Sequence, residues 1–371
     1  MEFSISKNAL QKELGFVQGI VERKNTIPVL SNILIESMGE NAIRIIGTDL
    51  DTTLRCETEA EVVTPGSMCV GARKLFEIAR VLPDAAVNFR KEENNWAAVK
   101  CERSSFRIAG VERDSFPEVP AFRSAQVKLS AQVLNTFISR TIFAITLEES
   151  RYTLSGAKFM LDKSSGARMI TTDGHRLAYI ERKDLGEAAQ QVDMDALIPR
   201  KTLAELTKLT AQYEGDIGLA ADENHIYFEV GPRLLISRML TGQFPNYEMV
   251  MPKGNDKSAV FDSAPLGQAI RRVALMADDR SHAIRLQLVP GSLHISSQTA
   301  EEGEARETVA TEYAGEETEI GFNAQYLQDF LNIASDGQVA FEFKDGNSQA
   351  QLRPVSDPDY DYRYVVMPMR L

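Results

Sequence analysis

The chain of 371 residues is longer than one typical domain and indicates two or three. Its composition, 43% hydrophobic and 25% charged, is ordinary for a globular protein, and it contains no run of about 18 apolar residues that could cross a membrane. The formal net charge of −12 excludes a uniformly basic surface, although a local basic face can exist within an acidic total.

The first elements in the chain are a strand that leads into a helix, over residues 3–17, with Ser6 as the N-cap candidate. An alternating run at 42–57 predicts an antiparallel hairpin, and a second strand-to-helix pair follows at 70–82. Residues 95–110 alternate again and predict another hairpin. This part of the chain therefore combines two helices with several antiparallel strands.

The same order of elements recurs twice more, which indicates an internal repeat. New strand-to-helix pairs begin at Val127 and Val260, with Ser130 and Asp262 as N-cap candidates. The second strand-to-helix pair of each of these repeats lies at 198–210 and 322–334, and a further hairpin lies at 225–240. The segments that close the three repeats are 116–120, 244–252 and 362–368. Polar stretches with Pro or Gly punctuate the repeats. We therefore predict an α+β protein of three like domains, 1–125, 126–255 and 256–371, with six helices on antiparallel sheets.

Charge is distributed unevenly between these elements. The six predicted helices carry 13 basic residues, Lys24 among them, against five acidic ones, although the whole chain is acidic. Ordinary solvated helix faces are one explanation. The other is an electropositive helical surface that contacts phosphates without reading sequence, because no zinc-finger, RNP or basic-region pattern is present.

The stretch TTDGHRL, residues 171–177, has the residue types of a catalytic site. Asp173 could orient His175 as a general base. However, Thr48 and Asp49 repeat the Thr-Asp pair 124 residues earlier, at the spacing of the first two repeats. We therefore interpret the pair as a structural turn. Neither a metal-binding histidine spacing nor a phosphate-binding GxxxxGK motif occurs, so we expect no catalytic residue, metal or cofactor.

Seven short motifs, taken in order, carry a resemblance to a known family. They are GTDL (47–50), ARK (72–74), TDGHRLA (172–178), PRK (199–201), FPNY (244–247), GFN (321–323) and YVVMPMRL (364–371). Together they resemble the bacterial sliding clamps, the beta subunits of DNA polymerase III, over essentially the whole chain. The resemblance implies a non-catalytic head-to-tail homodimer, closed into a ring around duplex DNA and lined by helices.

The resemblance also implies partners and a location. We expect an ATP-driven clamp loader, the DNA polymerase III alpha subunit, and other polymerases and repair proteins that carry short clamp-binding motifs. The chain has no secretory h-region and its three cysteines form no CxxC pair, so we expect a cytoplasmic, nucleoid-associated protein with reduced thiols and no membrane contact.

The matching positions imply three sets of site residues. The expected peptide pocket consists of Arg151, Leu154, Thr172, Gly174, His175, Arg176, Leu177, Pro245, Val250, Asn323, Tyr326, Val365, Val366, Met367, Pro368, Met369, Arg370 and Leu371. The expected DNA contacts are Lys24, Arg73, Tyr152, Arg200 and Lys201. The expected dimer interface joins Phe106 and Ile108 to Leu275 and Met276 of a second copy, with membership of the internal core as the alternative.

Some positions depart from the family pattern. Met249 stands where a basic residue is common and Ser281 where a bulky one is, which leaves the peptide preference open. The loop at Leu147–Glu149 carries two carboxylates that would repel phosphates. Two other classes are alternatives: a hydrolase that uses Asp173 and His175, and a sequence-specific DNA-binding protein. The first predicts turnover that is lost in His175→Ala, and the second predicts tight binding to one short duplex with free ends.

Overall fold

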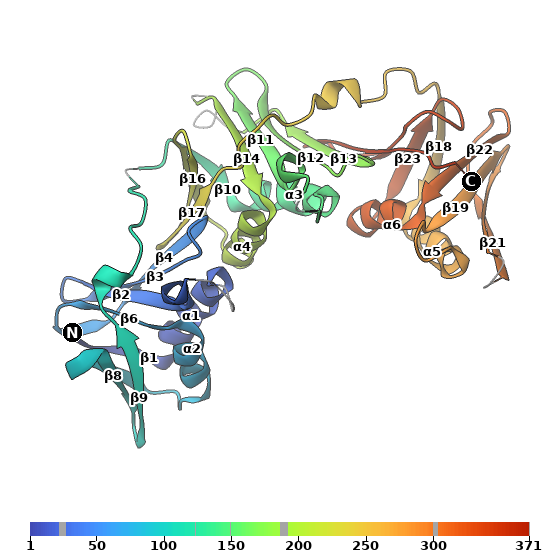
Figure 1. Cartoon of the computed structure of the whole chain (residues 1–371). Helices are drawn as coiled ribbons and strands as arrows, with labels where there is room; N and C mark the ends of the chain where they lie inside the picture. The colour runs from blue at the N-terminus through green and yellow to red at the C-terminus, as the bar shows by residue number, and fades with distance from the viewer. Residues whose placement is uncertain (22–26, 123, 149, 186–191, 300–302, 371) are drawn as a thin grey trace. The chain divides into compact units, whose positions relative to one another are not determined.

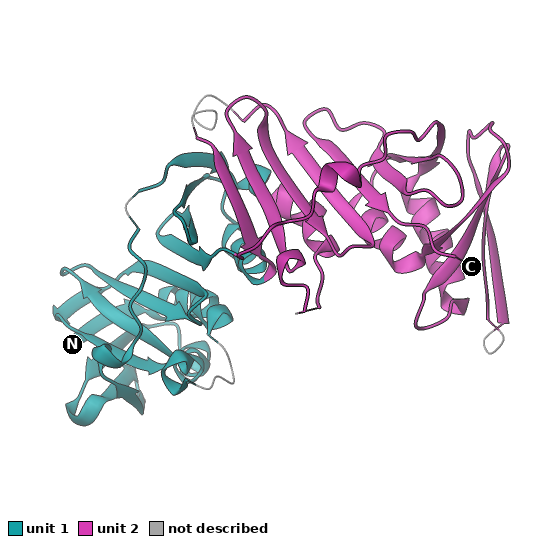
Figure 2. Cartoon of the chain, turned by 45° about the horizontal axis from the view of Figure 1, so that its top comes forward, with its two compact units in different colours: residues 1–134, 201–239 teal, residues 135–200, 240–371 magenta. Residues whose placement is uncertain are grey.

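The protein is an α+β chain, as predicted, and its computed structural model describes residues 1–21, 27–122, 124–148, 150–185, 192–299 and 303–370 (Figure 1). Within these residues the α-helices number six, as the repeat predicts. None of the described helices is long and apolar enough to span a membrane. The described chain divides into two compact units: unit 1 is 1–134 with 201–239, and unit 2 is 135–200 with 240–371 (Figure 2).

Unit 1 is built on one antiparallel sheet of 13 strands. The strands, in spatial order, are β10 (Val127–Ser130), β15 (Asp216–Ala221), β16 (His225–Val230), β17 (Arg233–Arg238), β4 (Thr52–Glu59), β3 (Ala42–Thr48), β2 (Asn32–Met38), β6 (Ser67–Gly71), β9 (Ser104–Val111), β8 (Trp96–Cys101), β7 (Ala86–Lys91), β1 (Glu2–Ser6) and β5 (Glu61–Thr64). The hairpins predicted at 42–57, 95–110 and 225–240 are present as β3–β4, β8–β9 and β16–β17.

Unit 2 contains two antiparallel sheets. The sheet of eight strands has the order β14 (Met194–Pro199), β11 (Gly156–Asp162), β12 (Gly166–Thr172), β13 (Arg176–Arg182), β25 (Asp361–Val366), β24 (Ala350–Pro354), β23 (Gln338–Phe343) and β18 (Lys257–Asp262). The sheet of four has the order β21 (Gly303–Ala310), β20 (Ser292–Thr299), β19 (Ala283–Val289) and β22 (Thr318–Asn323).

Every α-helix follows directly on a strand, as the sequence pattern predicts. The helices are α1 (Lys7–Ile20), α2 (Ala72–Val81), α3 (Ala131–Thr141), α4 (Arg200–Thr210), α5 (Ser263–Val273) and α6 (Ala324–Ile333). α1 packs on α2, and α5 packs on α6. The helices are amphipathic, so each buries an apolar stripe and exposes most of its charged side chains, with Glu13 on α1 and Glu205 on α4 as buried exceptions. α1 ends at Ile20, so Lys24 lies beyond it and outside the described residues.

The predicted N-caps differ in their chemistry. Ser6 Oγ accepts a hydrogen bond from Ala9 N at 3.2 Å, and Ser130 Oγ accepts one from Gln132 N at 3.2 Å. Asp262 is the N-cap residue of α5, as predicted, but its side chain caps no backbone N–H. Its carboxylate instead accepts a hydrogen bond from Gln338 Nε2 at 3.2 Å, because the neighbouring strand β23 supplies a donor beside it.

The two large sheets cross the boundaries between sequence repeats. β4 of the first repeat pairs with β17 of the second, and β13 of the second pairs with β25 of the third. Backbone hydrogen bonds therefore continue from one repeat into the next. Because of these shared sheets, each compact unit contains one terminal repeat and part of the middle one.

The Thr-Asp pair forms the same turn in both repeats, which confirms that it is structural. Asp49 Oδ1 accepts the N–H groups of Asp51 and Thr52, at 3.0 and 2.6 Å. Asp173 Oδ1 accepts the equivalent pair, from His175 at 2.9 Å and Arg176 at 3.0 Å. A side chain that hydrogen-bonds the backbone two and three residues on stabilises a tight turn. The sequence motif therefore encodes local geometry.

Two glycines of the motifs have a steric role. Gly174 has a φ of 90° in the turn, a conformation that glycine adopts without a Cβ penalty. The equivalent position in the first repeat is Leu50, which has a φ of 82°. Gly47 lies under α1, and a Cβ on it would approach Val17 Cγ1 to 2.4 Å. Glycine at position 47 therefore allows α1 to contact β3 closely.

Candidate functional site

Unit 2 contains a small cavity of about 90 Å³ at the ends of strands β12, β13 and β25. A loop that includes the short 3-10 helix Tyr247–Met249 covers one side of it. The residues that line the cavity are Leu154, Thr172, Gly174, His175, Arg176, Leu177, Pro245, Tyr247, Val250, Val365 and Met367. Ten of these eleven belong to the predicted peptide pocket. The prediction did not include Tyr247, although this residue ends the FPNY motif that contains the predicted Pro245.

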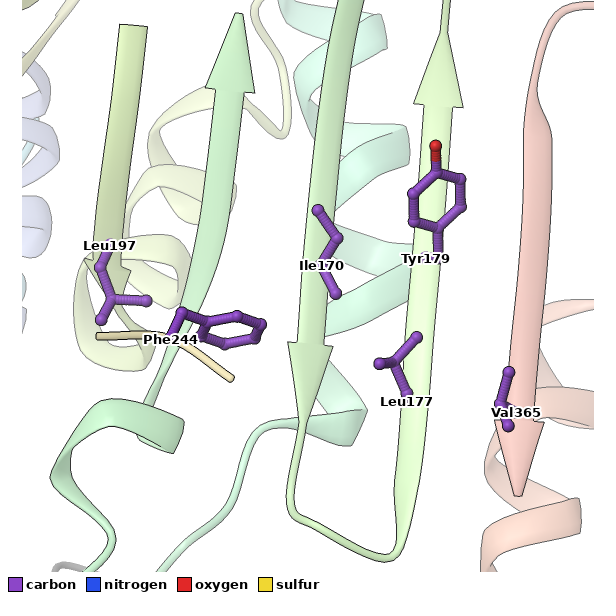
Figure 3. Packing of buried hydrophobic residues seen from close by; sticks show 6 residues of the cluster. All are labelled: Ile170, Leu177, Tyr179, Leu197, Phe244 and Val365. Atoms are coloured by element: carbon purple, nitrogen blue, oxygen red, sulfur yellow. The ribbon is translucent and has the colours of Figure 1, made fainter. Parts of the chain in front are cut away.

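The floor of the cavity is formed by Leu177 and Val365, which belong to a larger cluster of buried apolar side chains. Figure 3 shows Ile170, Leu177, Tyr179, Leu197, Phe244 and Val365 on one face of the sheet. Leu177 and Val365 are register partners on β13 and β25, so the side chains lie next to each other. Burying side chains of this kind stabilises the fold by about 1.5–3 kcal/mol each. The floor is therefore rigid, and a ligand would meet a preformed apolar surface.

The C-terminal tail closes another side of the cavity and is held at two points. Met367 N donates to His175 O at 2.9 Å, which joins the tail to the Thr-Asp turn. Two residues further on, Met369 N donates to Gly321 O at 2.8 Å. The two methionine side chains are half-buried. Met367 lines the cavity, and because methionine is flexible and polarizable, this wall can adapt to different apolar groups.

Asp173 and His175 do not form an acid–base pair. Asp173 Oδ1 binds the backbone N–H groups of the turn, and Oδ2 accepts Arg176 Nε at 2.9 Å. Both carboxylate oxygens are therefore used to shape the turn. The His175 side chain is exposed at the rim of the cavity. This arrangement can bind a ligand but does not activate a nucleophile.

Arg176 differs from the rim residue that the sequence predicts. It lines the cavity, but its guanidinium is occupied: Nη1 donates to Asp329 Oδ2 at 2.6 Å and Nη2 to Phe143 O at 2.7 Å. The ring of Tyr326 lies 4.4 Å from it. The side chain is only 10% exposed. Arg176 therefore joins segments of the protein to one another.

Other predicted pocket residues are not among those that line this cavity. Arg151 Nη1 donates to Asp173 O at 2.7 Å, and its Nε pairs with Glu148 at 2.9 Å. Asn323 caps α6 through Gln325 N and Tyr326 N. Val366 is fully buried on the strand next to Val365. The remaining members are Pro368 and Met369, which are half-buried, Arg370, which is exposed, and Leu371, which lies outside the described residues.

Buried tyrosines support the helix that carries Asn323 and Tyr326. Tyr364 donates through its hydroxyl to Tyr326 O at 2.9 Å, and its ring stacks on Phe330 with 5.3 Å between centroids. Burial raises the pKa of Tyr364 well above the ordinary value, and burial also raises the pKa of Tyr326. Both phenols therefore remain neutral donors at any physiological pH, and the packing of α6 does not depend on their titration.

The described residues of the predicted DNA-contact set have different surroundings. Arg73 is 75% exposed and pairs with Glu77 at 2.8 Å. Tyr152 and Arg200 are exposed. Lys201 is less available, because its ammonium pairs with Asp49 and donates to Ile20 O at 3.1 Å. Lys24 lies outside the described residues. Exposed ion pairs are weak, so the first three side chains can reorient toward a phosphate.

The predicted interface residues are divided between the units. Leu275 is 74% exposed in unit 2, in the short 3-10 helix Ala274–Met276 that contacts β21. In unit 1, Phe106 is half-buried on β9, whereas Ile108 is 8% exposed and belongs to the core. Phe106 and Leu275 are therefore available to another chain in this structure, and Ile108 contributes mainly to its own unit.

The fold and the site together define a class of protein. A strand-to-helix pair occurs twice in each of three sequence repeats, on antiparallel sheets that continue between repeats, and this is the architecture of a three-domain clamp. The family models agree. The DNA polymerase III beta subunit N-terminal, central and C-terminal domains match residues 1–120, 128–246 and 248–370.

Individual relatives support the same assignment. The beta sliding clamps of Pseudomonas putida and Caulobacter vibrioides are 37% and 34% identical over the full length of both chains. A solved sliding clamp of Pseudomonas aeruginosa, bound to griselimycin, superimposes with a TM-score of 0.93 at 36% identity, and full coverage of both chains. The solved sliding clamp of Bartonella birtlesii, also bound to griselimycin, superimposes with a TM-score of 0.94 at 30% identity, again with full coverage of both chains. The chain belongs to the bacterial beta sliding clamp family, the non-catalytic beta subunits of DNA polymerase III.

Proposed function

We propose that two copies of this chain close head to tail into a ring around duplex DNA. The ring slides along the duplex and tethers the replicative polymerase and repair proteins. In this proposal, residues 1–125, 126–255 and 256–371 act as the three domains, and the protein works on the nucleoid in the cytoplasm. The observation that carries the proposal is a pair of open sheet edges.

The first open edge is in unit 1. β9 pairs with β8 along Ser104–Ala109, but it pairs with β6 only at Gly110 and Val111. Among the described strands, the rest of β9 has no neighbour on that side. Arg103 and Arg107 lie at this edge and are exposed. Unpaired strand edges of this length readily pair with another chain.

The second open edge is in unit 2. β21 pairs with β20 over eight residues and, among the described strands, has no partner on its other side. It carries Glu304, Arg306 and Glu307, with Glu304 paired to Arg306 and Glu307 to Arg272, and the exposed Leu275 lies beside it. Each edge presents unpaired backbone groups to a second strand, and an apolar side chain, Phe106 or Leu275, is available next to it. A contact between two different surfaces that closes on itself produces a cyclic dimer.

The cavity in unit 2 provides the tether in this proposal. Its apolar floor and methionine wall fit one or two large apolar side chains of an extended segment, and the exposed His175 can hydrogen-bond a polar group such as a glutamine. Ten residues of the pocket set predicted from the sequence line this cavity, which supports the proposal. A clamp loader would open the ring with ATP, because the chain carries no nucleotide-binding motif.

Contact with DNA would come from the basic helix residues. Arg73, Lys74 and Arg200 are exposed. Their contacts would be weak and sequence-independent, as sliding requires. Glu148, which is 62% exposed, would keep its own loop away from phosphates.

The test is retention of the protein on DNA. The protein is loaded with a cognate clamp loader and ATP onto a nicked circular plasmid, which is then cut once. We expect retention on the circle and loss after linearisation, and we expect Leu275→Asp not to be retained on either form. Equal retention on circular and linear DNA would show chemical binding and would refute the ring.

A further inference from the structure

The guanidinium of Arg176 is the centre of a buried network that the family resemblance does not explain. It contacts the Thr-Asp turn through Asp173 Oδ2 at 2.9 Å, the segment before residue 145 through Phe143 O at 2.7 Å, and α6 through Asp329 Oδ2 at 2.6 Å. Three segments, distant in sequence, therefore meet at one side chain.

Asp329 is fully engaged on the other side of this contact. Its Oδ1 accepts Gln325 Nε2 at 2.6 Å on the same helix, while Oδ2 faces Arg176. Its side chain is 21% exposed. Tyr326, three residues earlier on α6, lies against the face of the Arg176 guanidinium at 4.4 Å. The spacing of three places both side chains on the face of α6 that meets β13.

The register of β13 shows why this network affects the cavity. Arg176 pairs with Val366, and the next residue, Leu177, pairs with Val365. Because successive side chains in a strand point to opposite faces, Leu177 and Val365 form the cavity floor while Arg176 points to the other side of the sheet. The network therefore lies directly behind the wall formed by Gly174 and His175.

We propose that Arg176 and Asp329 form a brace that positions the wall of the peptide cavity, and that the guanidinium of Arg176 acts by positioning this wall. The proposal rests on the proposed function of the cavity. The brace holds the turn at residues 172–176 against α6. The same turn holds the C-terminal tail, because His175 O accepts a hydrogen bond from Met367 N. Without Asp329, the turn and the tail lose their fixed positions, although the apolar floor remains.

The first two repeats contain a related device, which supports this role. Asp49, in the equivalent turn, pairs with Lys201 at the start of α4. Glu205 occupies the place in α4 that Asp329 occupies in α6, and it is buried against α1 at Gly19. In both cases the carboxylate of a Thr-Asp turn is joined, through a cation, to the second helix of the following repeat. The later turn also lines the cavity described above.

The experiment compares the affinity of full-length variants for a fluorescent peptide that carries glutamine and leucine anchors. Asp329→Asn removes the charge but keeps the shape. Asp357→Asn is the matched control, because Asp357 pairs with Arg140 in the same unit, is similarly buried, and is not among the residues that line the cavity. Asp329→Glu tests rescue, and Gln325→Ala provides a milder change should Asp329→Asn fold poorly.

We expect Asp329→Asn to weaken peptide binding about ten-fold, which corresponds to about 1.4 kcal/mol. Asp329→Glu should recover most of this loss, Gln325→Ala should lose about two- to three-fold, and Asp357→Asn should bind like the wild type even where its melting temperature falls equally. The brace is refuted if Asp329→Asn binds like the wild type, or if Asp357→Asn loses as much affinity. A wild-type protein that binds no peptide would instead refute the proposed function of the cavity.

Discussion

Replacing Glu13 by glutamine should destabilise unit 1 strongly, because it leaves a buried arginine without its counter-charge. Glu13 on α1 and Arg233 on β17 form a bidentate pair, in which Arg233 Nε is 2.7 Å from Glu13 Oε2. The two side chains are 6% and 9% exposed. The guanidinium also lies 4.6 Å from the centre of the Phe16 ring. The pair joins the first repeat to the second.

The magnitude follows from desolvation. Removing one partner of a buried ion pair costs about 3–5 kcal/mol, because the other charge stays buried and uncompensated. Glutamine keeps the shape of glutamate and one acceptor, so we expect a loss near the lower limit, about 3 kcal/mol. The double variant Glu13→Leu/Arg233→Met removes both charges, and we expect its free energy of unfolding to lie within about 2 kcal/mol of the wild type.

The chain offers a local probe for this measurement. Its single tryptophan, Trp96, lies on β8 in unit 1, so urea unfolding followed by tryptophan fluorescence reports on the same unit. The matched control is Glu57→Gln. Arg44 and Glu57 also form a close pair, at 2.9 Å, but they are 21% and 40% exposed. Exposed pairs of this kind contribute about 1 kcal/mol or less.

Two results would contradict the desolvation argument. One is a Glu13→Gln variant that is no less stable than Glu57→Gln. The other is a double variant as unstable as the single one, since that would place the loss in packing of the helix against the strand and not in the unpaired charge.

Three further changes are predicted. Gly47→Ala should cost about 1–3 kcal/mol in urea unfolding, because its Cβ would lie 2.4 Å from Val17 Cγ1, whereas Gly254→Ala, with open space around it, should be neutral; equal effects would contradict the close approach. Leu275→Asp should weaken the dimer at least ten-fold in sedimentation, about 1.4 kcal/mol, while Val81→Asp on α2 should not; a stable Leu275→Asp dimer would place the interface elsewhere. Burial raises the pKa of Cys69 to about 11 and that of Tyr227 to about 12, so the stability that these groups contribute is present below about pH 8.5 and should fall as the pH rises from there to 12. Urea titrations at a series of pH values across that range measure the free energy of unfolding. Cys69→Ala should reduce the fall of this free energy below pH 11.

Local patterns carried much of the fold. The strand-to-helix pairs, the hairpins and the Thr-Asp turn each depend on residues close together in the chain, so periodicity and capping residues were enough to predict them. Because the same weak pattern occurs three times in the same order, it predicted three domains. The motifs of the resemblance predicted the apolar lining residues Leu177, Val250 and Val365. These three residues line the same cavity in unit 2.

The partners of the charged side chains could not be predicted from local sequence patterns. Arg176 and Asp329 are 153 residues apart, and Lys201 and Asp49 are 152 apart. Lys201 looked like a free basic residue on a helix, and Arg176 like the rim of a pocket. Which carboxylate meets each cation depends on how one repeat packs on the next, and neither periodicity nor composition contains that information.

The amino-acid sequence by itself therefore determined the repeat, the α+β class and the family, because these rest on short-range patterns that every repeat contains. Only the tertiary structure decided that Ile108 is mainly core, that Tyr247 lines the cavity and that the guanidinium of Arg176 binds Asp329 and Phe143. The physical reason is that neighbouring residues in a strand face opposite sides, and the partner on each side is supplied by a distant segment.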